Sequence, residues 1–289
     1  MLLVTGANGI LGREVCKLLK LEGAAFIPLV RRDKGFIDGC VEIDLTEELA
    51  LEAFTAKGVK GVIHLAAAVP HSKQYPDSEK SARKTEAIDR NIHSFCEALG
   101  LAVVYASTCG LYDRRSAVEK KEDTDLIVVE GPYFAAKLAG EELFSKLELA
   151  SILRFSAIVG KGQKRSVVLS RFIEMARSDQ PITLWGGGTR QQNFVDARDA
   201  ARITCEAIWK PRKSLVNVAA KEPVSMSSLA EEVIKTIGGG EVTFVDKADP
   251  REGEFAAYSI SKAKDLFGWS PELPLEQSIA HIANEEFAE

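Results

Sequence analysis

The sequence predicts an α/β protein built on a doubly wound parallel sheet, with a smaller, mixed α/β part toward the C-terminus. Short apolar runs alternate with helix-length segments through the first half of the chain, as they do where helices cover both faces of a parallel sheet. Beyond residue 160 this alternation loosens into segments marked by glycine and proline. At 289 residues, the chain is long enough for one large domain, or for a larger and a smaller one that share a cleft.

The elements of the first half follow from the apolar runs and the segments between them. Candidate strands lie at 2–4, 25–30, 41–43, 62–65, 103–106 and 151–155. Candidate helices lie at 9–21, 47–56, 80–98 and 132–147. The last helix has a proline in its first turn, where the N–H that proline lacks would have no acceptor in any case. This order predicts parallel strands joined by helical crossovers.

Three glycines mark the turn between the first strand and the first helix. Thr-Gly-Ala-Asn-Gly-Ile-Leu-Gly occupies 5–12, so that Gly6, Gly9 and Gly12 stand three residues apart. A turn without Cβ atoms lets a pyrophosphate approach the backbone N–H groups at a helix N-terminus. Spaced glycines alone are weak evidence for such a site, because glycine is common in turns for conformational reasons. Their place between a strand and a helix predicts a Rossmann-type dinucleotide site.

A second motif, Tyr-Phe-Ala-Ala-Lys at 133–137, stands on a later candidate helix. Tyr133 and Lys137 are four residues apart and therefore share one face of that helix. Together, the two motifs resemble the extended branch of the short-chain dehydrogenase/reductase superfamily, the NAD(P)-dependent epimerase/dehydratase family. The resemblance extends to 260–264 and 266–271 near the C-terminus, and so spans nearly the whole chain.

The resemblance implies two parts that interleave along the chain. Residues 1–160 are expected to form a dinucleotide-binding Rossmann domain, and residues 161–289 a smaller substrate-binding part. A strand near 214–218 is expected to return to the main sheet.

The resemblance also implies a catalytic group of Thr108, Tyr133 and Lys137. Tyr133 would act as the acid/base, and a phenol with a pKa of about 10 needs its anion stabilised for that role. The Lys137 ammonium and oxidised nicotinamide would lower the pKa of Tyr133, and Lys137 would also hold the nicotinamide ribose. Thr108 stands four residues before Tyr112, as the family's catalytic hydroxyl does. Ser107 is the alternative, or a residue that lines the nicotinamide.

The strand after the glycine turn indicates which dinucleotide binds. Relatives that prefer NAD place an acidic residue at its end for the ribose diol, and here that position is Val30, followed by Arg31 and Arg32. A guanidinium binds a 2′-phosphate, so NADP is the expected cofactor. The alternative is NAD, with Asp33 on the ribose. The residues expected to bind the cofactor are Gly6, Asn8, Gly9, Ile10, Leu11, Gly12, Arg31, Arg32, Asp44, Leu45, Leu65, Ala66, Ala67, Ser107, Tyr133 and Lys137.

Two positions after Thr108 bear on the reaction. Sugar 4,6-dehydratases of the family carry an aspartate and a glutamate there, whereas this chain has Cys109 and Gly110. Elimination is therefore not expected, which leaves epimerisation or ketone reduction. Cys109 has no histidine partner in a recognisable motif and is expected to be a packing residue. His64 ends a buried strand and is also expected to be structural.

Two departures bear on the substrate. The family's asparagine and arginine ligands of a nucleotide-sugar are replaced by Ala157 and Gln192, with Arg190 and Arg165 as the candidate anion ligands here. A nucleotide-linked sugar is the expected substrate. A non-nucleotide carbonyl compound is the alternative among enzymes, and an NADP-sensing regulator without turnover is the alternative outside them.

Composition argues against several classes of partner. The net charge of −5 and the pI near 5.6 give no basic footprint for nucleic acid or an anionic membrane. No apolar run approaches the ~20 residues that cross a bilayer. The five cysteines have no paired spacing, which favours a reducing compartment, and the chain opens on a strand rather than a signal peptide, so the cytoplasm is expected. No metal site is expected.

The assembly is predicted from the family alone. Relatives often pair two helices per subunit in a four-helix bundle, and the matching segments here are 80–98 and 132–147. A homodimer is therefore the expected state. The alternative is that the apolar stripe of 132–147 packs only on its own sheet.

Overall fold

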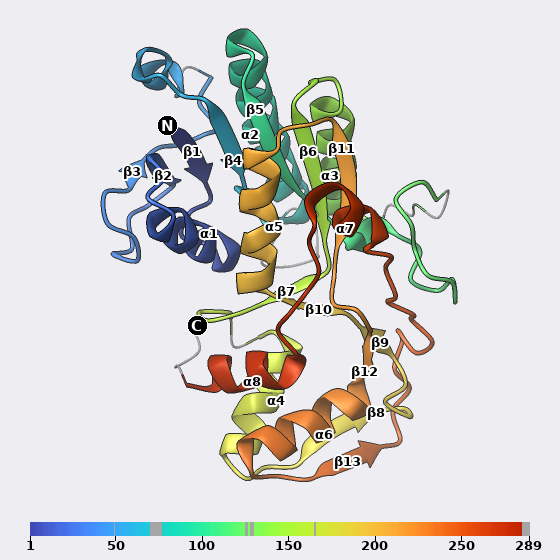
Figure 1. Cartoon of the computed structure of the whole chain (residues 1–289). Coiled ribbons are helices and arrows are strands. Elements are labelled where there is room, and N and C mark those ends of the chain that lie inside the picture. Colours follow the sequence, from blue (N-terminus) through green and yellow to red (C-terminus); the bar gives the residue numbers. More distant parts are fainter. Residues whose placement is uncertain (49, 70–76, 125–126, 128–129, 165, 285–289) are drawn as a thin grey trace.

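The computed structural model describes residues 1–48, 50–69, 77–124, 127, 130–164 and 166–284. Its centre is a seven-stranded parallel sheet in the order β11-β6-β5-β4-β1-β2-β3 (Figure 1). The strands are β1 (Leu2–Thr5), β2 (Phe26–Val30), β3 (Val41–Glu42), β4 (Gly61–His64), β5 (Ala102–Thr108), β6 (Ala150–Phe155) and β11 (Ser214–Val218). The predicted fold class, a doubly wound parallel sheet, is confirmed.

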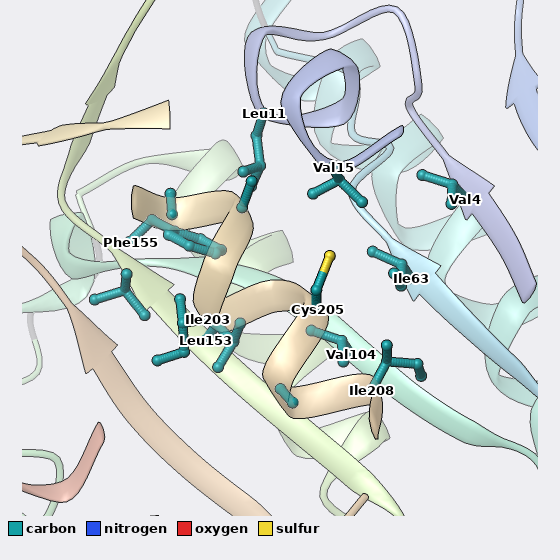
Figure 2. Packing of buried hydrophobic residues seen from close by; sticks show 14 of the residues in the cluster. Val4, Leu11, Val15, Ile63, Val104, Leu153, Phe155, Ile203, Cys205 and Ile208 are labelled. Carbon is teal, nitrogen blue, oxygen red and sulfur yellow. The ribbon is translucent and has the colours of Figure 1, made fainter. Parts of the chain in front are cut away.

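Helices cover both faces of the sheet. α1 (Ile10–Leu21) and α5 (Ala197–Trp209) pack on one face, whereas α2 (Asp77–Leu99) and α3 (Pro132–Phe144) pack on the other. Successive residues of a strand point to opposite faces, so the central strands are apolar throughout. Figure 2 shows the first face, where Val15 of α1 and Ile203 of α5 belong to one cluster of buried side chains with Val104 and Leu153 of the sheet.

The strand order creates the position for a ligand. From β1 the chain runs outward to β2 and β3, then returns to β4 on the other side of β1. In open α/β sheets, ligands bind beyond the carboxyl ends of the strands at such a reversal. The glycine turn follows β1 and the segment 65–68 follows β4, so both lie at this point.

The later part of the chain contributes to the main sheet and also forms a second, smaller core. β11, α5 and α7 (Ser261–Phe267) pack with the sheet. The smaller core lies below the sheet in Figure 1 and is formed mainly by α4, α6, α8 and a parallel pair of strands. Its elements are α4 (Val168–Arg177), β8 (Ile182–Trp185), α6 (Met226–Ile237), β13 (Val242–Val245) and α8 (Leu275–Ala283).

Two short sheets connect the parts: β7 (Ala157–Val159) pairs with β10 (Phe194–Asp196), and β9 (Gln191–Gln192) pairs with β12 (Val224–Ser225). These strands carry Ala157 and Gln192, the two positions at which the sequence departs from the family pattern that it resembles.

The helix expected at 47–56 is wrong. Among the described residues of this segment, which omit residue 49, only the 3₁₀ helix Glu52–Lys57 forms, and it ends at Gly58 in a left-handed conformation (φ 65°). The preceding segment is held as a turn because the Asn91 side chain of α2 donates to the carbonyls of Leu45 and Glu47 (2.9 and 3.2 Å). A local sequence pattern could not predict this turn, because the donor to both carbonyls comes from another helix.

Within the described residues, no helix is both long enough and apolar enough to cross a membrane.

Candidate active site

The glycine turn after β1 fits a dinucleotide. Gly6 has a φ of +66°, and a Cβ there would lie 2.8 Å from the backbone nitrogen of Ala66. A Cβ on Gly12 would lie 2.3 Å from the carbonyl oxygen of Gly6. The turn is therefore packed so closely that only glycine is accommodated. The first N–H groups of α1 have no acceptors within the helix, and the exposed Gly9 before them leaves the approach open to a pyrophosphate.

The end of β2 carries the groups expected at the adenosine ribose. Arg31 and Arg32 are both exposed, and Asn8 donates to the Arg32 carbonyl at 2.8 Å, while its own Oδ1 is buried and unpartnered. The carboxylate of Asp33 accepts the backbone N–H of Gly35 at 2.8 Å, and this bond lowers the pKa of Asp33. Asp33 thus accepts a hydrogen bond from its own loop, whereas the side chains of Arg31 and Arg32 are exposed, where they can bind a phosphate.

The other expected cofactor residues divide into two kinds. Leu65, Ala66 and Ala67 are half-buried after β4, and the backbone of the first two lies against Gly6, as expected for a wall of the site. Leu11 and Leu45 differ, since their side chains are buried in the two hydrophobic clusters of the sheet. Their contribution to a cofactor would be limited to backbone groups.

The three expected catalytic residues come from β5 and α3. Thr108 ends β5, and Tyr133 lies in the first turn of α3, where Pro132 begins the helix. Both line one cavity of about 240 Å³. Lys137 lies one helical turn beyond Tyr133 and is 4% exposed, with its Nζ donating to the Ala106 carbonyl at 2.8 Å.

The structure shows no lowering of the pKa of Tyr133 by Lys137. Burial raises the pKa of Tyr133 to about 12, and the negative charge of Asp89 adds to that effect. The phenolate is therefore not stabilised by the protein alone. A cation delivered with the cofactor would have to supply that stabilisation.

The two candidate hydroxyls have different partners. Ser107 is buried and donates to the Glu141 carboxylate, which forms a bidentate pair with Arg154 (2.8 and 2.6 Å). Thr108 accepts the Gly110 N–H at 3.0 Å, which leaves its proton available to a ligand in the cavity. The geometry favours Thr108 for contact with a substrate.

The positions after Thr108 leave no space for a dehydratase carboxylate. Cys109 is buried, and its thiol donates to the Arg154 carbonyl at 3.1 Å, which accords with a packing role. A Cβ on Gly110 would lie 2.5 Å from a ring carbon of Phe134. The Phe134 ring thus occupies the direction in which a longer side chain would extend.

The cavity contains two arginines that the sequence did not indicate. Arg114 and Arg251 both line it with Thr108 and Tyr133, and both lie close to Glu254 (3.6 and 2.6 Å). Arg251 lies in the loop after β13, more than a hundred residues from Tyr133. Only a tertiary contact brings it to the cavity.

The substrate ligands expected from sequence are placed less favourably. Arg190 forms an ion pair with Asp249 at 3.0 Å and is not among the residues lining the cavity. Arg165 lies outside the described residues. Ala157 and Gln192 do line the cavity, so the departures from the family stand at the site itself.

The sequence is similar to one protein family and to individual relatives. The profile of the NAD dependent epimerase/dehydratase family matches residues 2–219. The chain is 27% identical to a UDP-glucuronate 4-epimerase of Thermodesulfobacterium geofontis, over 98% of this chain and 94% of the relative. It is 28% identical to a putative UDP-glucose 4-epimerase of Methanocaldococcus jannaschii, over 98% and 97%.

A solved structure shows the same fold. The UDP-glucose 4-epimerase of Thermotoga maritima, crystallised with UDP-glucose, superposes with a TM-score of 0.86 at 20% identity, over 98% of this chain and 97% of that one. With the profile covering most of the chain, the glycine turn after β1 and the Tyr133–Lys137 pair on α3, this protein belongs to the NAD dependent epimerase/dehydratase family.

Proposed function

We propose that this protein is an NADP-dependent epimerase or reductase of a nucleotide-linked sugar. The observation that carries the proposal is the shared cavity, in which Thr108 and Tyr133 lie with Arg114 and Arg251. Hydroxyls suit a sugar carbinol or carbonyl, and guanidinium groups suit the phosphates of a nucleotide. The similarity to UDP-sugar 4-epimerases supports the same substrate class.

The chain's own residues account for the proton steps. Bound nicotinamide dinucleotide supplies the hydride acceptor or donor. Thr108 holds the reacting oxygen of the sugar by a hydrogen bond, and Tyr133 takes its proton on oxidation or returns one on reduction. Lys137, whose ammonium donates to the Ala106 carbonyl and the Tyr105 hydroxyl, keeps one N–H for the nicotinamide ribose. Phe134 fills the space beside Gly110 and keeps an eliminating base out of the site.

The substrate proposal is tested with a panel of sugars. The purified protein is incubated with NAD or NADP and UDP-glucose, UDP-glucuronate or their free sugars, and products are followed by NMR. Epimer formation without net consumption of cofactor supports an epimerase, and stoichiometric consumption of NADPH supports a reductase.

Two outcomes would replace the proposal. Turnover of free carbonyl compounds alone would favour the non-nucleotide substrate that Ala157 and Gln192 suggest. Tight NADP binding with no turnover of any sugar or ketone would favour the sensing regulator.

The preference for NADP gives a separate prediction. Changing Arg31 and Arg32 together to alanine is expected to weaken NADP about 10- to 100-fold, because one charge-assisted hydrogen bond to the 2′-phosphate contributes about 1.5–3 kcal/mol. Affinity for NAD should change little. Fluorescence titration of both cofactors measures the ratio. The control is Lys262→Ala with Lys264→Ala, which removes two exposed charges from α7. Equal loss for both cofactors would show that the arginines only solvate their loop.

We also propose a homodimer formed through α2 and α3. The two helices pack on each other, and Ala135 and Ala139 present small exposed side chains on α3 that allow a close approach. Light scattering at micromolar concentration should give twice the chain mass. A monomer mass would contradict the dimer and would indicate that the apolar residues of α3 pack only on their own sheet.

A further inference from the structure

A buried chain of hydrogen bonds runs from Lys137 through the sheet to the start of the glycine turn. The Lys137 ammonium donates to the Tyr105 hydroxyl at 3.2 Å, and Tyr105 donates to Asp89 at 2.8 Å. The second oxygen of Asp89 lies 2.9 Å from Nε2 of His64, whose Nδ1 lies 2.8 Å from the Thr5 hydroxyl. Each residue comes from a different element, in the order α3, β5, α2, β4 and β1.

The direction of every hydrogen bond follows from the last residue. The Thr5 hydroxyl oxygen accepts the backbone N–H groups of Leu65 and Ala66, each at 3.1 Å. Its own proton must then go to Nδ1 of His64, so Nε2 carries the ring proton and donates it to Asp89. Both oxygens of Asp89 are therefore acceptors, which is the arrangement of an ionised carboxylate.

Asp89 is also the acid available to balance Lys137. Burial lowers the pKa of Lys137, while the charges of Asp89 and Glu141 oppose that change. Glu141 is already bound on both oxygens by the Arg154 guanidinium, so its charge is largely neutralised. The neighbouring rings carry no charge that could balance the Lys137 ammonium. Burial lowers the pKa of His64 and raises the pKa of Tyr133, so both side chains are neutral.

The packing around this chain is specific. A Cβ on Gly140 of α3 would lie 2.0 Å from the Tyr105 hydroxyl oxygen and 2.6 Å from Asp89. The Tyr105 ring stacks on Phe144 at 4.5 Å and also lies 4.5 Å from the Lys137 nitrogen. The absence of a side chain at position 140 is what lets α3 approach the hydroxyl and carboxylate this closely.

We propose that Asp89, acting through the Tyr105 hydroxyl, is a positioning residue that keeps Lys137 charged and holds its ammonium in place, one helical turn from Tyr133. This inference rests on the proposed oxidoreductase function for its kinetic consequence. The part of the inference that concerns the charge of Lys137 does not depend on which sugar is the substrate.

The first test compares the titration of Lys137 in three proteins. The side-chain Nζ resonance of Lys137, assigned with Lys137→Arg, is followed by NMR through the alkaline pH range. Loss of the Asp89 charge in Asp89→Asn should move the titration to lower pH by about one unit or more. The control is Asp199→Asn, which alters an equally buried carboxylate on α5 (1% exposed) that is paired with Arg202. It should leave the Lys137 titration unchanged.

A second variant guards against loss of folding. Tyr105→Phe keeps the ring that stacks on Phe144 but removes the hydroxyl between Lys137 and Asp89. NADPH binding, measured by fluorescence, should weaken severalfold, and the loss should grow as pH rises because less of Lys137 stays protonated.

Turnover gives the third measurement once a substrate is known. Because the charge of Asp89 raises the pKa of both Tyr133 and Lys137, both limbs of the pH profile should move to lower pH in Asp89→Asn. A profile lowered at every pH without displacement would indicate a structural role only. An unchanged Lys137 titration in Asp89→Asn would overturn the inference. Failure to find a substrate would bear on the proposed function and not on this result.

Discussion

Turnover is expected to fall about 10²–10⁴-fold when Tyr133 is changed to phenylalanine, the range for one acid/base group. The change removes only the phenolic hydroxyl. The ring would keep its edge contact with Phe134, whose centroid lies 5.4 Å away, so the first turn of α3 should be preserved. Cofactor affinity should therefore stay close to that of the unchanged protein.

The measurement is kcat for the sugar together with the cofactor dissociation constant. Lys137→Met is the informative comparison, because Lys137 is expected to touch the cofactor ribose as well as support Tyr133. That variant should lose both turnover and affinity. Turnover near the original level in Tyr133→Phe would remove this tyrosine from the reaction, and unchanged affinity in Lys137→Met would remove the ribose contact.

Much of the fold was predictable because its signals are local. Buried parallel strands must be apolar on both faces, so runs such as 103–106 stand out, and the helix begun by Pro132 is marked by its own first turn. The helix predicted at 47–56 was wrong for the opposite reason. The conformation of this part of the chain depends on a hydrogen bond from Asn91, which is far away in sequence.

The candidate site could be predicted where its residues stand in motifs. The glycine turn and the pair of Tyr133 and Lys137 could be found by spacing, and the structure places both at the carboxyl edge of the sheet. Arg114 and Arg251 could not be predicted, because each lies in a loop without a sequence motif. Their place in the cavity depends on tertiary contacts such as their ion pairs with Glu254. Asp89 could not be found from the sequence either. It lies on a helix with many exposed charged residues, and no local pattern marks this one carboxylate as buried.

The pKa of Tyr133 shows a further limit of motif reasoning. A lysine four residues away on a helix predicts a lowered pKa, but the pKa depends on where the ammonium points and on how much solvent is lost. In the structure Lys137 is directed at Ala106 and Tyr105, and burial of Tyr133 dominates. Spacing places Tyr133 and Lys137 on one face of a helix but does not determine the balance of charge around them.

The largest expected effect on stability comes from the buried ion pair behind the site. Arg154 of β6 is 4% exposed and donates to both oxygens of Glu141 (2.8 and 2.6 Å) as well as to the Tyr112 hydroxyl (2.8 Å). Arg154→Met keeps an unbranched chain of similar length but leaves the buried Glu141 carboxylate without its paired guanidinium. Removing one partner of such a pair costs about 3–5 kcal/mol, chiefly because the remaining charge is uncompensated.

Urea denaturation measures this loss as a lower midpoint with an unchanged slope. The double variant Glu141→Met with Arg154→Met separates charge from packing, because two apolar side chains can replace a buried pair at little net cost. We expect the double variant to recover a large part of the loss. The remainder would come from the Ser107 hydroxyl, which loses its acceptor Glu141, and from the Tyr112 hydroxyl, which loses the Arg154 donor but still donates to Asn217. A double variant as unstable as the single one would show that Arg154 stabilises the fold through its contacts in the sheet rather than by neutralising Glu141.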